Sequence, residues 1–108
     1  MKKTLIAAIA LTFSAVMVAS AAEAKDNWNK ICAKCHGPDG KGQTKMGQKL
    51  GIKNLTDAKV QSELKDDAAF KSIKEGIKDK DGKILMKPAE GISDDEIKAL
   101  VAFVRTFK

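Results

Sequence analysis

The stretch ICAKCHGPDGKG, from Ile31 to Gly42, contains both cysteines and the only histidine of the 108-residue chain. Cys32 and Cys35 are separated by two residues, and His36 follows the second cysteine directly. Three kinds of site use cysteines at this spacing: a redox dithiol, a structural zinc site and a site of covalent haem attachment. The rest of the sequence has to distinguish between them.

The context of the motif disfavours a dithiol and a zinc site. A dithiol oxidoreductase normally carries its CxxC after a strand, within a βαβ unit, and no strand pattern precedes Ile31. That chemistry would also leave His36 without a role. A structural zinc site needs four ligands, whereas no further cysteine or histidine follows His36.

Covalent haem uses all three side chains at once. Cysteines at i and i+3 lie on one face of a helix and can form thioether bonds to the two vinyl groups of one porphyrin, while the next residue can reach the iron. The sequence therefore predicts that Cys32 and Cys35 attach one haem c covalently. It also predicts that His36 is an axial ligand of the haem iron.

The first 24 residues have the layout of a secretory signal peptide. A basic head, Met1–Lys3, precedes an almost entirely apolar run over residues 4–22, and Ala-x-Ala steps end at Ala21 and Ala24. We expect cleavage after Ala24, a mature domain over residues 25–108 and a periplasmic location. A retained membrane anchor is the alternative, because the apolar run is just long enough to span a bilayer.

The mature domain is small for a hydrophobic core that has no other support. We therefore expect the chemistry at the two cysteines to supply the missing part of the core. The chain is basic, with a net charge of +6 at pH 7, and basic proteins attract nucleic acids, membranes or acidic partners. An exported chain without a nucleic-acid-binding motif is not expected to bind nucleic acid.

The apolar residues recur at the period of a helix rather than of a strand, which predicts an all-α domain. Trp28, Ile31, Cys32 and Cys35 are spaced as one stripe of a short helix. A second helix is expected at about residues 66–76.

The start of the last helix is marked by a capping box, in which Ser93 precedes Glu96 by three residues. A stripe of apolar residues follows it: Ile97, Leu100, Val101 and Val104. The segments 37–55 and 77–91 are long for loops in a compact domain. They are expected to wrap around the haem.

The second axial ligand decides what the iron can do. Haem iron with one protein ligand can bind oxygen, carbon monoxide or peroxide, whereas iron bound on both sides mainly transfers electrons. With no second histidine, the candidates in the mature chain are Met46 and Met86. Met86 lies far along the chain from His36, in a loop that Pro88 stiffens, so we expect Met86 to be the ligand and Met46 to fill space in the core.

Two stretches of the mature chain resemble the class I monohaem c-type cytochromes, small bacterial electron carriers such as the soluble c6- and c551-like proteins. They are WNKICAKCHGPDGKG, residues 28–42, and LMKPAEGISDDEIKALVAFVRTF, residues 85–107. The resemblance implies a cytochrome c fold with three to five short helices and long loops wrapped around a covalent haem. It implies electron transfer through the exposed haem edge rather than catalysis on a substrate, and iron ligation by His36 and Met86.

The resemblance also implies a specific packing contact and shows two departures from the family pattern. Trp28 is expected to pack against Phe103, with Leu100 beside it. Lys87 separates Met86 from Pro88, where many family members have methionine directly followed by proline. No proline lies in GQTKMGQKL, residues 42–50, so the group that accepts a hydrogen bond from the His36 ring is not assigned.

Such a carrier is expected to be a monomer. Its redox partner proteins are expected to be acidic at the site where they dock. Lysines would steer these partners electrostatically, and the candidates are Lys34, Lys41, Lys45 and Lys87. No stable membrane insertion is expected after cleavage. Two alternatives stay open: a haem with a labile methionine that binds a gas or peroxide, and a fixed electron-transfer subunit of a larger oxidoreductase.

Overall fold

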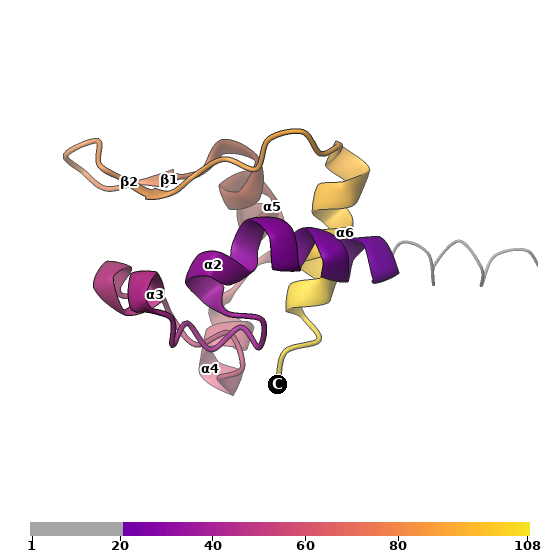
Figure 1. The fold of residues 1–108 in the computed structure, drawn as a ribbon, viewed down its shortest axis with the longest axis horizontal. Coiled ribbons are helices and arrows are strands. Elements are labelled where there is room, and N and C mark those ends of the chain that lie inside the picture. Colours follow the sequence, from indigo (N-terminus) through magenta and orange to yellow (C-terminus); the bar gives the residue numbers. More distant parts are fainter. Residues whose placement is uncertain (1–20) are drawn as a thin grey trace, which may run out of the picture.

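The computed structural model describes residues 21–108, which form short helices and one small β-hairpin (Figure 1). The expected all-α class with several short helices is confirmed, with the hairpin as an addition. Residues 21–27 are helical and run directly into the first named element. The elements are η1 (Trp28–Cys32), α2 (Ala33–His36), α3 (Lys45–Leu50), α4 (Ala58–Glu63), α5 (Asp66–Glu75), β1 (Ile77–Lys78), β2 (Ile84–Met86) and α6 (Asp94–Val104).

Most of the expected signal peptide, residues 1–20, lies outside the described residues. No helix within residues 21–108 is long and apolar enough to cross a membrane. Ala24 is only 2% exposed, and it lines a small hollow together with Asn27 and Ala99 of α6. Cleavage after Ala21 would keep this contact in the mature domain, whereas cleavage after Ala24 would remove it. The cleavage position stays a prediction.

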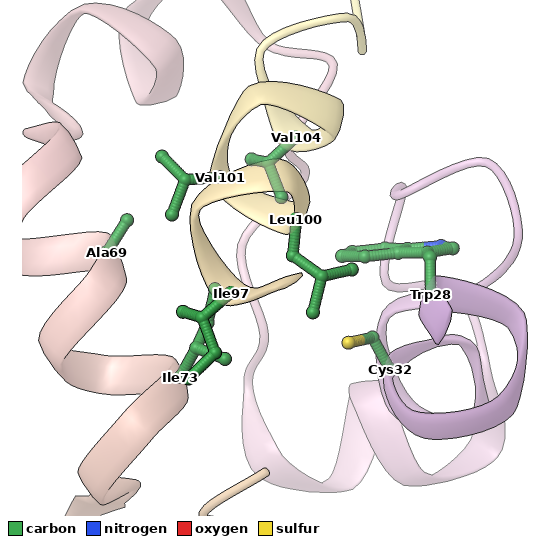
Figure 2. Close-up of a cluster of buried hydrophobic side chains, with 8 residues drawn as sticks. All are labelled: Trp28, Cys32, Ala69, Ile73, Ile97, Leu100, Val101 and Val104. Carbon is green, nitrogen blue, oxygen red and sulfur yellow. The ribbon is translucent and has the colours of Figure 1, made fainter. Parts of the chain in front are cut away.

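The hydrophobic core lies where α5, α6 and the first helical segment meet (Figure 2). Leu100 is completely buried and points from α6 toward Trp28 and Cys32 in Figure 2. The apolar stripe predicted for the last helix is therefore the side that α6 turns to the core. The buried cluster consists of Trp28, Cys32, Ala69, Ile73, Ile97, Leu100, Val101 and Val104.

The capping box at the start of α6 forms as predicted. The Ser93 hydroxyl accepts a hydrogen bond from the Glu96 backbone N–H at 3.2 Å, and the Glu96 carboxylate accepts one from the Ser93 N–H at 3.0 Å. The other carboxylate oxygen of Glu96 accepts a hydrogen bond from the Asn27 side chain at 3.3 Å. The cap therefore also ties α6 to the first helical segment.

The end of α6 is fastened by Arg105, which lies just after its last turn. The Arg105 Nε donates to the Asp66 carboxylate at 2.8 Å, and Nη1 donates to the Gln61 carbonyl at 2.7 Å. Nη2 donates to the Leu64 carbonyl. The Gln61 amide in turn donates to the Leu55 carbonyl at 2.7 Å and the Val104 carbonyl at 2.9 Å. This network joins α6 to the α4–α5 junction.

Both segments that the sequence suggested were long loops contain regular structure. Helix α3 is capped at its start by Thr44, whose hydroxyl accepts a hydrogen bond from the Gly47 N–H at 2.8 Å, and at its end by Gly51 in the left-handed conformation. The segment after α5 forms the β1–β2 hairpin. These elements are too short to show a periodicity in the sequence, which is why the pattern of apolar residues did not reveal them.

Candidate functional site

The three residues of the motif lie close together on two short, consecutive helical segments. Cys32 is the last residue of η1, while Cys35 and His36 belong to α2. The η1 segment is a π-helix, closed by a hydrogen bond from the Ala33 N–H to the Trp28 carbonyl. Single π-helical turns within α-helices are often found at functional sites.

The wider turn of η1 changes which side chains the helix buries. Trp28 and Cys32 are buried, as the sequence pattern predicts, but Ile31 is 39% exposed. The sequence spacing places Ile31 on the same stripe as these two residues, on the assumption of the 3.6-residue turn of a regular α-helix. A π-helical turn contains more residues and rotates Ile31 away from the core.

Both cysteines are free thiols and can therefore form thioether bonds. The Cys32 thiol is buried, and burial together with the neighbouring Cys35 raises its pKa to about 11. Until it forms a thioether bond, Cys32 is thus a neutral thiol at physiological pH. The other cysteine is only half-buried, so the two sulphur atoms differ in their access to solvent.

The His36 imidazole has no hydrogen-bond partner for its buried Nδ1 atom within residues 21–108. A buried polar atom without a partner is rare in proteins, and it points to a group that the protein alone does not supply. Burial lowers the pKa of His36, which keeps the imidazole neutral at pH 7. Neutral imidazole is the form that binds metals, so the His36 side chain is in the form that could bind iron.

The carbonyl groups at the end of α2 are held by the segment that follows. The Thr44 hydroxyl donates to the Cys35 carbonyl at 2.6 Å, and the Gly42 N–H donates to the His36 carbonyl at 2.7 Å. These bonds fix the backbone of the motif from the side of α3. Sequence reasoning missed Thr44, although threonine ahead of a short helix is a recognisable N-cap.

Trp28 connects the motif to the end of the chain. Its indole lies 5.8 Å from the Phe103 ring and 5.0 Å from the Phe107 ring, measured between centroids. The expected contact with Phe103 is therefore present. The indole also lies 5.4 Å from the His36 ring, so a single aromatic side chain contacts both α6 and the candidate iron ligand.

Met86 reaches the site region from the hairpin, as the last residue of β2. It pairs with Ile77 across the hairpin and packs, partly buried, against the cluster that contains Trp28 and Cys32. Met46, by contrast, lies on α3 and is 39% exposed. Helix α3 and the hairpin lie at the same end of the molecule (Figure 1).

The donor set fits covalent haem better than a bare metal ion. No group of three or more histidine, cysteine, aspartate or glutamate side chains within residues 21–108 could hold a metal ion. The site offers instead two thiols and an imidazole whose Nδ1 atom has no partner, and Met86 packs against the same cluster as Cys32. A surface hollow of about 410 Å³ between α5 and α6, lined by Phe70 and Val101 among others, contains none of these groups.

Comparisons with known proteins agree with this assignment. The family model described as cytochrome C oxidase, cbb3-type, subunit III matches residues 19–104. A solved structure, the KustC0563 c-type cytochrome, is 34% identical, with a TM-score of 0.67, over 79% of this chain and 96% of that chain. A mutant of Kustc0563 is 33% identical, with a TM-score of 0.66, over 80% of this chain and 99% of that chain.

A search of curated proteins found no match. The family match covers most of the chain, and the two solved structures match it over nearly their whole length. The resemblance noted in the sequence is therefore confirmed. The chain belongs to the cytochrome c family and is a small, mainly helical electron-transfer protein with covalently bound haem c.

Proposed function

We propose that the protein is a periplasmic carrier that transfers single electrons through a haem attached at Cys32 and Cys35, whose iron is bound by His36 and Met86. The observation that supports this proposal best is the buried His36 Nδ1 atom, which has no hydrogen-bond partner within residues 21–108, next to the thiols of Cys32 and Cys35. Met86, on a hairpin distant in sequence, is a soft second ligand. A carrier without substrate chemistry agrees with the family, whose members transfer electrons.

Each residue has a distinct part in this function. The haem, when bound, supplies a one-electron iron couple. The neutral His36 and the Met86 thioether both bind Fe(II) well, which favours a higher reduction potential than two histidines would. Thioether bonds at Cys32 and Cys35 keep the cofactor attached. Trp28 is only 3% exposed and its ring lies 5.4 Å from the His36 ring. It therefore helps to keep water away from His36.

The charge of the surface favours acidic redox partners. Exposed lysines lie on the motif helix and in the segments around it, and opposite charges on a partner would raise the rate of encounter. Salt screens such attraction at a distance of about 10 Å at 0.1 M ionic strength. Electron exchange with a natural partner should therefore slow as salt rises. The lysines concerned are Lys34, Lys41, Lys45 and Lys87, all of them exposed.

The proposed ligand set is tested by replacing each methionine in turn. Met86→Ala should abolish the methionine-to-iron charge-transfer band of the oxidised protein and allow rapid binding of carbon monoxide to the reduced protein. Met46→Ala, the matched control on exposed α3, should change neither. An unchanged band in Met86→Ala would refute the proposed coordination. Loss of the band in Met46→Ala alone would assign the ligand to Met46.

A further inference from the structure

Gly76 lies where the end of α5 crosses the backbone of the Met86 segment. It follows the last residue of α5 and has φ 79° and ψ 179°, a conformation that is essentially restricted to glycine. A Cβ atom built on Gly76 would lie 2.6 Å from the Met86 carbonyl oxygen and 2.9 Å from the Pro88 nitrogen. Both neighbours are backbone atoms, so no rotation of a side chain can make room.

The Met86 segment is also held on two other sides. Met86 pairs with Ile77, the residue that directly follows Gly76. The Ala89 N–H donates to the Ile73 carbonyl of α5 at 2.9 Å. Met86 is thus fastened to β1 and the backbone after it is fastened to α5, and Gly76 lies in the chain between these two attachments.

We propose that Gly76 is a positioning residue that sets where the Met86 side chain stands, by allowing this close backbone approach. The inference rests on the proposed function, in which Met86 binds the iron. It assigns a role to a residue that carries no ligand atom. Any side chain at this position would push the Met86–Pro88 backbone away from α5 and carry the thioether out of place.

Two other glycines make it possible to separate this effect from backbone strain. Gly82 in the hairpin turn has φ +82° and Gly91 has φ +77°, close to the +79° of Gly76. A Cβ atom at Gly82 or Gly91 would meet no heavy atom within 4 Å. Alanine at these positions therefore imposes an unfavourable φ without a close contact.

The experiment compares Gly76→Ala with Gly82→Ala and Gly91→Ala in the haem-containing protein. Gly76→Ala should lose most of the methionine-to-iron charge-transfer band and lower the reduction potential. Cyanide should bind to its oxidised iron about tenfold faster or more, because strain of this kind weakens the methionine bond. Gly82→Ala and Gly91→Ala should keep the band and the slow binding of cyanide. Equal changes in all three variants, or none in Gly76→Ala, would overturn the proposal.

A second variant covers the case in which Gly76→Ala yields no haem-containing protein. Pro88→Ala changes the segment that faces Gly76, since the Pro88 Cδ lies 3.0 Å from where a Cβ of residue 76 would stand, and it removes the ring that restricts the backbone there. It should loosen the segment and speed cyanide binding. Pro38→Ala, at the other proline of the chain, should not. Equal rates of cyanide binding in Pro88→Ala and Pro38→Ala would mean that the segment facing Gly76 does not position Met86, and would overturn the proposal.

Met86→Ala separates failure of this inference from failure of the proposed function. If Met86→Ala keeps the charge-transfer band, the ligand assignment itself is wrong. If Met86→Ala loses the band while Gly76→Ala keeps it, Met86 is the ligand but Gly76 does not position it.

Discussion

The indole Nε1 of Trp28 donates a 3.0 Å hydrogen bond to the carbonyl oxygen of Gly37, the residue directly after the candidate ligand His36. Both residues are buried. The bond spans nine positions and closes the turn of chain that contains the two cysteines and the histidine. One side chain thus holds both ends of the haem-binding motif while its ring packs against α6.

Replacing Trp28 with phenylalanine should destabilise the protein by about 0.5–1.5 kcal/mol, because the buried Gly37 carbonyl would lose the indole donor and keep only the Gly40 N–H at 3.1 Å. Unfolding by denaturant, followed by haem absorbance, gives the free energy. Phe103→Leu is the control, since it removes the aromatic ring that packs against Trp28 but leaves the hydrogen bond of the Trp28 indole in place. A loss in Trp28→Phe below about 0.5 kcal/mol, the usual range for surface substitutions, would show that this bond contributes little.

Replacing Arg105 with lysine should also cost about 1–3 kcal/mol. Lysine cannot reproduce the planar arrangement with which Arg105 reaches Gln61, Leu64 and Asp66 together. Asp66→Asn is the matched control, because it removes only an ion pair whose carboxylate is 71% exposed. Such exposed pairs contribute about 0–1 kcal/mol. Equal losses in the two variants would mean that the ion pair, rather than the bonds to backbone carbonyls, is what matters.

The carboxyl group of Glu96 should make the free energy of unfolding depend on pH in the acid range. Hydrogen bonds from the Ser93 backbone, then from the Asn27 and Ser93 side chains, lower the pKa of Glu96 below its ordinary value of 4.5. The folded state therefore binds this proton more weakly than the unfolded state does. The resulting stabilisation is complete above pH 4.5 and is lost as the pH falls through the folded-state pKa.

Glu96→Gln should therefore lose less stability than the unmodified protein when the pH is lowered from 7 through this range. Glu90→Gln, on the loop before α6, should keep the original pH dependence. The measurement is the free energy of unfolding at a series of pH values. A Glu96→Gln curve parallel to the original would contradict the linkage.

The last helix could be predicted from sequence because its signals are local. Ser93 and Glu96 lie three residues apart, and the apolar stripe behind them has the period of a helix. The motif residues were equally recognisable, since the CxxC spacing, the adjacent His36 and the lack of further cysteines and histidines together point to haem attachment. The prediction extended to Trp28 and Phe103, which meet across the core.

Other features escaped prediction because they depend on contacts between distant parts of the chain or on very short elements. Arg105 meets Gln61 across 44 positions, and nothing in either local sequence indicates the other. The π-helical turn at η1, in which Ile31 is 39% exposed while Trp28 and Cys32 are buried, has no signal in the sequence. The close approach of Gly76 to Met86 becomes visible only when the hairpin is folded onto α5.

Mass spectrometry of peptides from the haem-containing protein tests the central claim most directly. The account predicts that the peptide containing Cys32 and Cys35 carries one haem, bound through both sulphur atoms. It predicts that neither thiol can be alkylated after unfolding. A haem-free peptide with two reactive thiols, or a disulfide between Cys32 and Cys35, would contradict the account.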